Sequence, residues 1–165
     1  MAVAIKEETT AVIDSREGKY LTFALGDEEY GLGILKVREI IGYMETTAVP
    51  QMPSHIKGVI NLRGQVIPVI DIRTKFGMNT VDITEQTCII VVEITRQNKK
   101  CFTGIIVDKV SEVLDIKEEA IEDAPNFGTG VQTEFILGMG KVSNSVKILL
   151  DIDKVLVGDD FSMIS

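Results

Sequence analysis

Two stretches of this chain, residues 56–72 and 136–152, carry the same pattern of residues. When one is shifted onto the other by 80 positions, five residues coincide in order. The coinciding pairs are Ile56 and Ile136, Gly58 and Gly138, Val66 and Val146, Asp71 and Asp151, and Ile72 and Ile152. A repeat of this kind constrains the fold strongly, because both copies must form the same supersecondary unit.

The repeated unit is predicted to be a β-hairpin. β-Branched runs flank the tight turn Asn61-Leu-Arg-Gly-Gln65, and such runs around a glycine-containing turn favour a hairpin. The preceding segments also align, at a shift of 73, with Val37–Ile41 falling on Val110–Leu114. Residues 34–41 fit a short helical turn or a twisted strand equally well. Asp71 and Asp151 recur at the strand ends, which suggests that each caps the following turn.

The repeat predicts an all-β chain of two similar lobes divided near residue 85. Ile and Val dominate a hydrophobic content of 45%, which favours strands and suffices for a core. Five short strands per lobe suggest small barrels, because closure removes exposed edges. We expect a flexible tail over 1–18, a first barrel over 19–85, a second over 86–152, and a short C-terminal helix and tail over 153–165.

The charge of the chain excludes several classes of partner. A formal net charge of −8 repels phosphates, so nucleic-acid binding is not expected. No apolar run approaches the ~20 residues that span a bilayer, and residues 1–10 lack the features of a signal peptide. These observations predict a cytoplasmic protein that does not insert into a membrane.

The sequence offers little for catalysis, so we predict that the protein is not an enzyme and holds no cofactor or metal. His55 is the single histidine, and no CxxC, GxSxG or glycine-rich phosphate loop is present. A β-barrel enzyme with an inter-lobe active site would need convergent titratable groups, and no candidates stand out. A binding role remains.

Three features are candidates for binding. Arg63 has Ser143 as its repeat partner, so the fold does not demand a cation there. Arg63 is then either a solvated hairpin tip or a guanidinium aimed at a partner's carboxylate or backbone carbonyls. Val37 and Glu39 would point the same way on a strand, although Glu112 repeats Glu39, which favours a structural role. Phe127 lies in a Pro/Gly loop, either as a core residue or as an interface anchor.

These residues also carry a family resemblance. The chain resembles the CheW family, the adaptors of bacterial chemotaxis arrays, over roughly residues 18–157. The matching motifs are Gly26–Gly31, Ile34–Ile40, Ile56–Gly58, Asn61–Gly64, Pro68–Arg73, Gly104–Asp108, Val110–Leu114 and Ala124–Phe127. The resemblance implies two SH3-like five-stranded β-barrel subdomains around a shared hydrophobic core, with short helical turns and a short C-terminal helix.

The resemblance also implies a function. It predicts a non-enzymatic scaffold that links chemoreceptors, the methyl-accepting chemotaxis proteins, to the histidine kinase CheA. The receptor's helical tip would lie in an apolar groove between the lobes, a helix-in-groove mode. The residues implied at the receptor surface are Val37, Glu39, Gly58, Asn61 and Arg63. Those implied at the contact with the regulatory domain of CheA are Leu32, Ile34 and Phe127.

Two further expectations follow from the resemblance. The free protein would be a monomer in the cytoplasm, recruited to membrane-associated receptor arrays. The alternative function is that of a paralogous adaptor in a chemosensory pathway other than chemotaxis.

Overall fold

The protein folds into two β-lobes, seen in a computed structural model that describes residues 16–125 and 133–156. The first half of the chain forms β1 (Gly18–Leu25), β2 (Glu28–Gly33), the 3₁₀ turn η1 (Ile34–Lys36), β3 (Val37–Gly42), β4 (Ile56–Leu62), β5 (Gln65–Asp71) and α2 (Ile72–Lys75). The second half forms β6 (Cys88–Arg96), β7 (Lys99–Val107), β8 (Lys109–Ile116), η2 (Glu118–Ala120), β9 (Ile121–Glu122), η3 (Thr133–Phe135), β10 (Ile136–Val142), β11 (Ser145–Leu150) and α3 (Ile152–Leu156).

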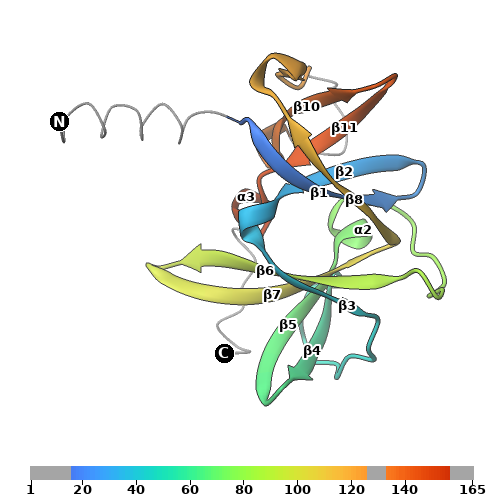
Figure 1. The fold of residues 1–165 in the computed structure, drawn as a ribbon. Coiled ribbons are helices and arrows are strands. Elements are labelled where there is room, and N and C mark those ends of the chain that lie inside the picture. Colours follow the sequence, from blue (N-terminus) through green and yellow to red (C-terminus); the bar gives the residue numbers. More distant parts are fainter. Residues whose placement is uncertain (1–15, 126–132, 157–165) are drawn as a thin grey trace.

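Each lobe takes strands from both halves of the chain. The six-stranded lobe has the order β8-β1-β2-β11-β10-β9, and the five-stranded lobe has the order β3-β6-β7-β5-β4. Figure 1 shows the six-stranded lobe above the five-stranded one, with α2 and α3 between them. The first hairpin of each half thus pairs with the later strands of the other half. The predicted boundary near residue 85 therefore does not separate the lobes. Because equivalent strands of the two halves carry the same residue pattern, the sequence could not show which half supplies the neighbour of a given strand.

The repeat itself is confirmed in detail. The parallel pairs β11–β2 and β5–β7 are equivalent, as are the antiparallel pairs β1–β8 and β3–β6. Both hairpins have a register shift at the same place, between Ile56 and Gly58 and between Ile136 and Gly138. Residues 34–41 contain both alternatives in succession, a 3₁₀ turn and then β3.

The short helices begin where the sequence predicted caps. The Asp71 carboxylate accepts a hydrogen bond from the Arg73 N–H at 3.0 Å, and the Asp151 carboxylate accepts one from the Lys154 N–H at 3.3 Å. The predicted C-terminal helix is α3, described as far as Leu156. At the other end, Arg16 forms ion pairs with Glu118 and Asp123, both at 2.8 Å, so the described part of the predicted 1–18 tail is tied to the six-stranded lobe.

A shared apolar core lies between the lobes, as predicted. It contains fully buried residues of the six-stranded lobe, such as Phe23 and Leu32, and of the five-stranded lobe, such as Ile70 and Ile90. Val155 of α3 completes it. Each lobe also has a smaller core of its own, around Val69 and Val91 in one and around Tyr20 and Leu149 in the other.

A charged clamp also joins the lobes. Arg73, in α2, donates from Nε and Nη2 to the Asp108 carboxylate at 2.8 Å and 2.6 Å, and from Nη1 to the Asn79 carbonyl. The same carboxylate accepts the Gly26 N–H, at the β1–β2 turn, at 2.7 Å. These bonds tie the end of β7 and α2 to the first hairpin of the other lobe. The hydrogen bonds from Arg73, together with that from Gly26, lower the pKa of Asp108 below its ordinary value.

This clamp predicts a pH dependence of stability. Because the folded-state pKa of Asp108 is depressed, its stabilisation is present above the unfolded value near 3.8 and is lost as pH falls through the folded pKa. We expect Asp108→Asn to lower the free energy of unfolding near neutral pH by about 2 kcal/mol. The loss of stability relative to the unmodified protein should shrink as pH falls below about 3.8 and Asp108 becomes protonated in the folded state. Urea unfolding across this range measures it.

Asp115→Asn is the matched control, because Asp115 is an exposed carboxylate on β8. It should change the free energy of unfolding by less than about 0.5 kcal/mol. A loss for Asp108→Asn that stays constant down to low pH would contradict the assigned ion pair.

Candidate interaction surface

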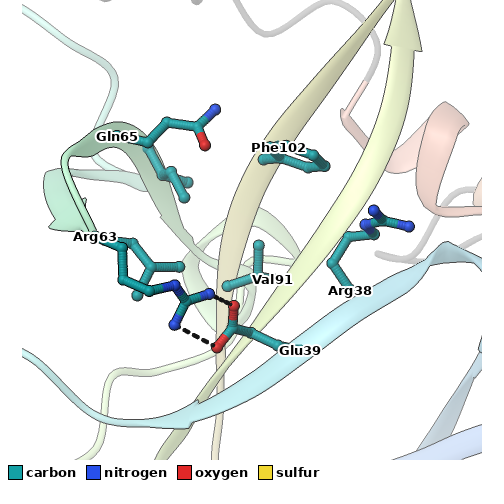
Figure 2. A pocket seen from close by; sticks show the side chains of 8 residues that line it. Arg38, Glu39, Arg63, Gln65, Val91 and Phe102 are labelled. Carbon is teal, nitrogen blue, oxygen red and sulfur yellow. Dashed lines mark hydrogen bonds and ion pairs between the residues drawn. The ribbon is translucent and has the colours of Figure 1, made fainter.

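Arg63 and Glu39 meet at the rim of a depression on the five-stranded lobe. The Arg63 guanidinium spans the Glu39 carboxylate, with Nη1 donating to Oε2 at 3.2 Å and Nη2 donating to Oε1. Figure 2 shows this pair beside the depression. The two residues come from different elements, the β4–β5 turn and β3. The hydrogen bonds that Arg63 donates to the Glu39 carboxylate raise the pKa of Arg63 above its ordinary value, so the guanidinium stays charged.

The turn that carries Arg63 is held in a left-handed conformation. Arg63 has φ 51° and Gly64 has φ 88°, the signs required at both central residues of a type I′ hairpin turn. The Asn61 side chain accepts the Gly64 N–H at 2.8 Å, so Asn61 shapes the turn rather than pointing freely into solvent. Ser143 adopts φ 54° at the repeated position. The fold therefore requires the backbone conformation there but not the arginine side chain.

A bulge in β3 builds the other side of the depression. The register shifts between Val37 and Glu39, and a bulge re-aims the side chains on either side of it. As a result, the consecutive residues Arg38 and Glu39 both line the depression, whereas regular alternation would send them to opposite faces. Val37 instead packs against the shared core. Val37 and Glu39 therefore have different surroundings, contrary to the prediction from strand alternation.

The depression has a volume of about 360 Å³. Beneath it lie Ile67 and Val91, which are buried at 2% exposure each, and the half-buried Phe102. On the side opposite Arg63, the Arg38 guanidinium lies 5.7 Å from the centre of the Phe102 ring, within the range of a cation–π contact. Sequence analysis missed Arg38 and Phe102, because neither the bulge nor the pairing of β6 with β7 next to β3 is visible as a motif.

Gly58 has a structural explanation. It is buried, with φ 142°, and a Cβ atom there would lie 2.0 Å from the carbonyl oxygen of Thr47. Thr47 exchanges two backbone hydrogen bonds with Val59, of 2.8 Å and 2.9 Å, and so connects the segment after β3 to β4. Gly58 therefore allows the close approach that completes the five-stranded lobe below the Arg63–Glu39 pair.

The residues predicted at the kinase contact lie elsewhere. Leu32 is fully buried, and β2 is an interior strand paired with β1 and β11, so Leu32 belongs to the shared core and offers no edge. Ile34 is half-buried against that core. The next residue, Leu35, is the most exposed large apolar side chain of the described residues and lines a separate groove of about 730 Å³. Phe127 lies outside the described residues.

Two structural findings bear on other classes of function. In the described ranges 16–125 and 133–156, no group of three or more His, Cys, Asp and Glu side chains could hold a metal ion. None of the helices in those ranges is long and apolar enough to cross a bilayer.

Comparison with known proteins decides the family. The family model for the CheW-like domain matches residues 19–159. The chain belongs to the CheW-like family. It is 41% identical over 146 residues to chemotaxis protein CheW of Klebsiella aerogenes, covering 88% of this chain and 86% of that protein. It is 34% identical over 143 residues to chemotaxis protein CheW of Bacillus subtilis, covering 87% and 86%.

In addition to these sequence matches, a solved structure supports the CheW-like fold. The crystal structure of the scaffolding protein TtCheW from Thermoanaerobacter tengcongensis matches with a TM-score of 0.76 and 36% sequence identity. The match covers 87% of this chain and 91% of that structure. The fold predicted from the resemblance, two β-subdomains around a shared core, is thereby confirmed.

The role of Gly58 leads to a stability prediction. We expect Gly58→Ala to lower the free energy of unfolding by about 3 kcal/mol, because the new methyl group would collide with the Thr47 backbone at a left-handed φ. Gly42→Ala is the control: nothing lies within 4 Å of its added Cβ, and the change should stay under about 0.5 kcal/mol. Thermal or urea unfolding of both variants measures this. Equal stability of the two variants would contradict the close approach at Thr47.

Proposed function

We propose that this chain is a non-enzymatic adaptor that couples chemoreceptors to the histidine kinase CheA. The observation that carries the proposal is the nearly full mutual coverage between this chain and relatives named chemotaxis protein CheW. The relative with the matching crystal structure, TtCheW, is named a scaffolding protein. The protein would act in the cytoplasm, at membrane-associated receptor arrays, and would be a monomer when free.

The Arg63–Glu39 pair is the proposed centre of the receptor contact. A guanidinium has five N–H donors, and the Arg63 side chain is 70% exposed while it binds Glu39. A carboxylate or carbonyl at the receptor's helical tip can therefore bind Arg63 without first displacing Glu39. Asn61 supports this contact by fixing the turn, and Gly58 supports it by allowing β4 to approach Thr47. Val37 would place β3 through its packing on the shared core.

The proposed kinase contact lies at η1. Ile34 anchors the turn in the core, and the exposed Leu35 beside it presents apolar surface to the regulatory domain of CheA. Phe127 remains a proposed second contact. The two proposed surfaces use different elements, so one adaptor can hold receptor and kinase together. Each contact is small, and repetition within an array would supply the strength by avidity.

Reconstitution tests the adaptor function directly. The full chain is mixed with CheA and a receptor cytoplasmic fragment, and co-sedimentation and kinase autophosphorylation are measured. We expect the chain to sediment with both partners and to alter autophosphorylation in a receptor-dependent way. If it changes neither quantity, the adaptor function is wrong.

Charge reversal at the rim tests the receptor contact. We expect Arg63→Glu to reduce co-sedimentation with the receptor fragment at least tenfold, because it places a like charge beside Glu39 and removes the outward donors. Arg63→Asn should also weaken receptor binding but keep the fold, because asparagine tolerates the left-handed conformation. Circular dichroism and unfolding midpoints check the fold.

The double variant Glu39→Arg/Arg63→Glu separates two roles of Arg63. It restores an ion pair between β3 and the turn but exchanges the charges. If Arg63 acts only by bonding Glu39, the double variant should recover receptor binding. If Arg63 binds the receptor itself, as we propose, binding should stay at the level of Arg63→Glu.

A further inference from the structure

The groove that Leu35 lines has a counterpart in the five-stranded lobe, because the fold is duplicated. The equivalent hairpins β1–β2 and β6–β7 and the equivalent pairs β11–β2 and β5–β7 fix which positions correspond. Residues that line the groove fall on residues that line a cavity next to the Arg73–Asp108 clamp. The corresponding residues are Gly33 and Ile106, Leu35 and Asp108, Leu137 and Lys57, Asp151 and Asp71, and Asp153 and Arg73.

In the five-stranded lobe, the linker between α2 and β6 covers this place. Residues 80–83 of the linker line the cavity. The linker is held on both sides of them, because the Asn79 carbonyl accepts a hydrogen bond from Arg73 at 2.8 Å and the Thr87 carbonyl accepts the Tyr43 N–H at 3.3 Å. The cavity that remains measures about 260 Å³. The segment that leads into β6 therefore closes the site in this lobe.

The corresponding segment of the six-stranded lobe is the one that leads into β1. Tyr20 pairs with Gly33 as Ile89 pairs with Ile106, so β1 and β6 correspond at a shift of 69. The same shift lays residues 11–18 on residues 80–87. Similar residues then coincide: Val12 and Val81, Ser15 and Thr84, and Glu17 and Gln86. Residues 11–15 are thus the positional equivalent of the linker segment that covers the cavity.

The groove is larger than its counterpart and exposes apolar side chains. It measures about 730 Å³. Gly33 stands where the counterpart has Ile106, and a Cβ atom on Gly33 would have no neighbour within 4 Å. Leu35 takes the place of Asp108 and is 92% exposed, and Leu137 is half-buried. Because apolar surface is stabilised by burial, the groove suits an apolar segment, and residues 11–15 contain two β-branched apolar residues in succession.

Arg16 fixes where this segment joins the groove. Its N–H donates to Glu118 at 2.9 Å, its guanidinium binds Glu118 and Asp123, and it donates to the Leu137 carbonyl at 3.2 Å. Arg16 is itself part of the groove wall. Four residues of chain reach at most about 14 Å, so Val12 cannot be farther than that from Arg16. A tether this short gives an effective concentration in the millimolar range, which populates even a weak contact.

We propose that residues 11–15 of this chain dock in the groove, with Val12 and Ile13 above Gly33 and against Leu35. The docked segment closes the six-stranded lobe as the linker closes the five-stranded lobe. It also covers the apolar surface of η1, and so it competes with CheA for the proposed kinase contact. The docking stands on the duplication alone, whereas the competition rests on the proposed function.

Tryptophan fluorescence tests the docking, because the chain contains no tryptophan. Ile13→Trp places the probe in the docking segment, and Ile5→Trp is the matched control, earlier in the same N-terminal segment. We expect the emission of Ile13→Trp to be blue-shifted relative to that of Ile5→Trp. Acrylamide should quench Ile13→Trp about twofold more weakly or less, because the docked indole is shielded and the short tether keeps it docked.

Amide shifts of the isotope-labelled full chain test the docking without the larger indole. We expect Val12→Ser/Ile13→Ser to shift the amides of Gly33–Lys36, and the matched control Val3→Ser/Ile5→Ser to leave them in place. Circular dichroism checks that both variants keep the fold. If Val12→Ser/Ile13→Ser also leaves these amides in place, and Ile13→Trp emits like the control, the proposal is overturned.

A change within the groove should release the probe. Adding Leu35→Asp to the Ile13→Trp variant should return its emission to that of Ile5→Trp, because a charge replaces the apolar contact. Leu35 is almost fully exposed, so this change should keep the fold. Val66→Asp is the control, an exposed apolar residue of the five-stranded lobe, and it should leave the emission blue-shifted. Equal effects of the two changes would show that the segment does not dock against Leu35.

The competition with CheA is measured separately. We expect Val12→Ser/Ile13→Ser to lower the Kd for CheA about threefold or more, because the competing segment is removed, and Val3→Ser/Ile5→Ser to leave it unchanged. If the segment docks but the Kd stays the same, the proposed kinase contact at η1 is wrong and the docking stands. If the docking signals are missing while the unmodified chain still couples receptor to kinase, the docking is wrong and the adaptor function stands.

Discussion

The apolar contact between the two lobes is the interaction on which the rest of this structure depends. Each half of the chain contributes its first hairpin to one lobe and its later strands to the other. The strands that cross over bury Phe23, Leu32, Ile70 and Ile105 completely in one shared core. Neither half could bury these side chains alone, because the strands that cover them come from the other half. The Arg73–Asp108 clamp fixes the same contact at its edge.

The contribution of strands from both halves of the chain to each lobe also explains where the proposed interaction surface lies. β3 is an outer strand of the five-stranded lobe, and its neighbour β6, with the next strand β7, belongs to the other half of the chain. Arg38 and Glu39 therefore face Val91 and Phe102, residues more than fifty positions away in the sequence. A bulge at this point re-aims two consecutive side chains into one depression. The depression forms because β6 and β7 come from the other half of the chain and because β3 has a bulge at this point.

The two lobes carry different side chains at equivalent positions of the duplicated fold. In the six-stranded lobe, Glu29 accepts hydrogen bonds from Lys147 and Ser111, and the hairpin tip carries Ser143 in place of Arg63. The first central residue of the turn, Arg63 or Ser143, is left-handed at both tips. The lobes differ in side-chain chemistry at these positions and in strand number, because β9 adds a sixth strand to one of them.

Local pattern alone determined much of this protein. The hairpin at 56–72, its copy at 136–152, the caps at Asp71 and Asp151 and the tight turn that carries Arg63 could all be predicted, because each depends on neighbours in the sequence. Tertiary structure decided the rest. It determined which hairpin joins which lobe, the burial of Leu32 and the exposure of Leu35. It also determined the close approach at Gly58 and brought Arg63 together with Glu39, Arg38 and Phe102. The physical reason is that equivalent strands present equivalent patterns. Only the burial of one continuous core selects which of them become neighbours.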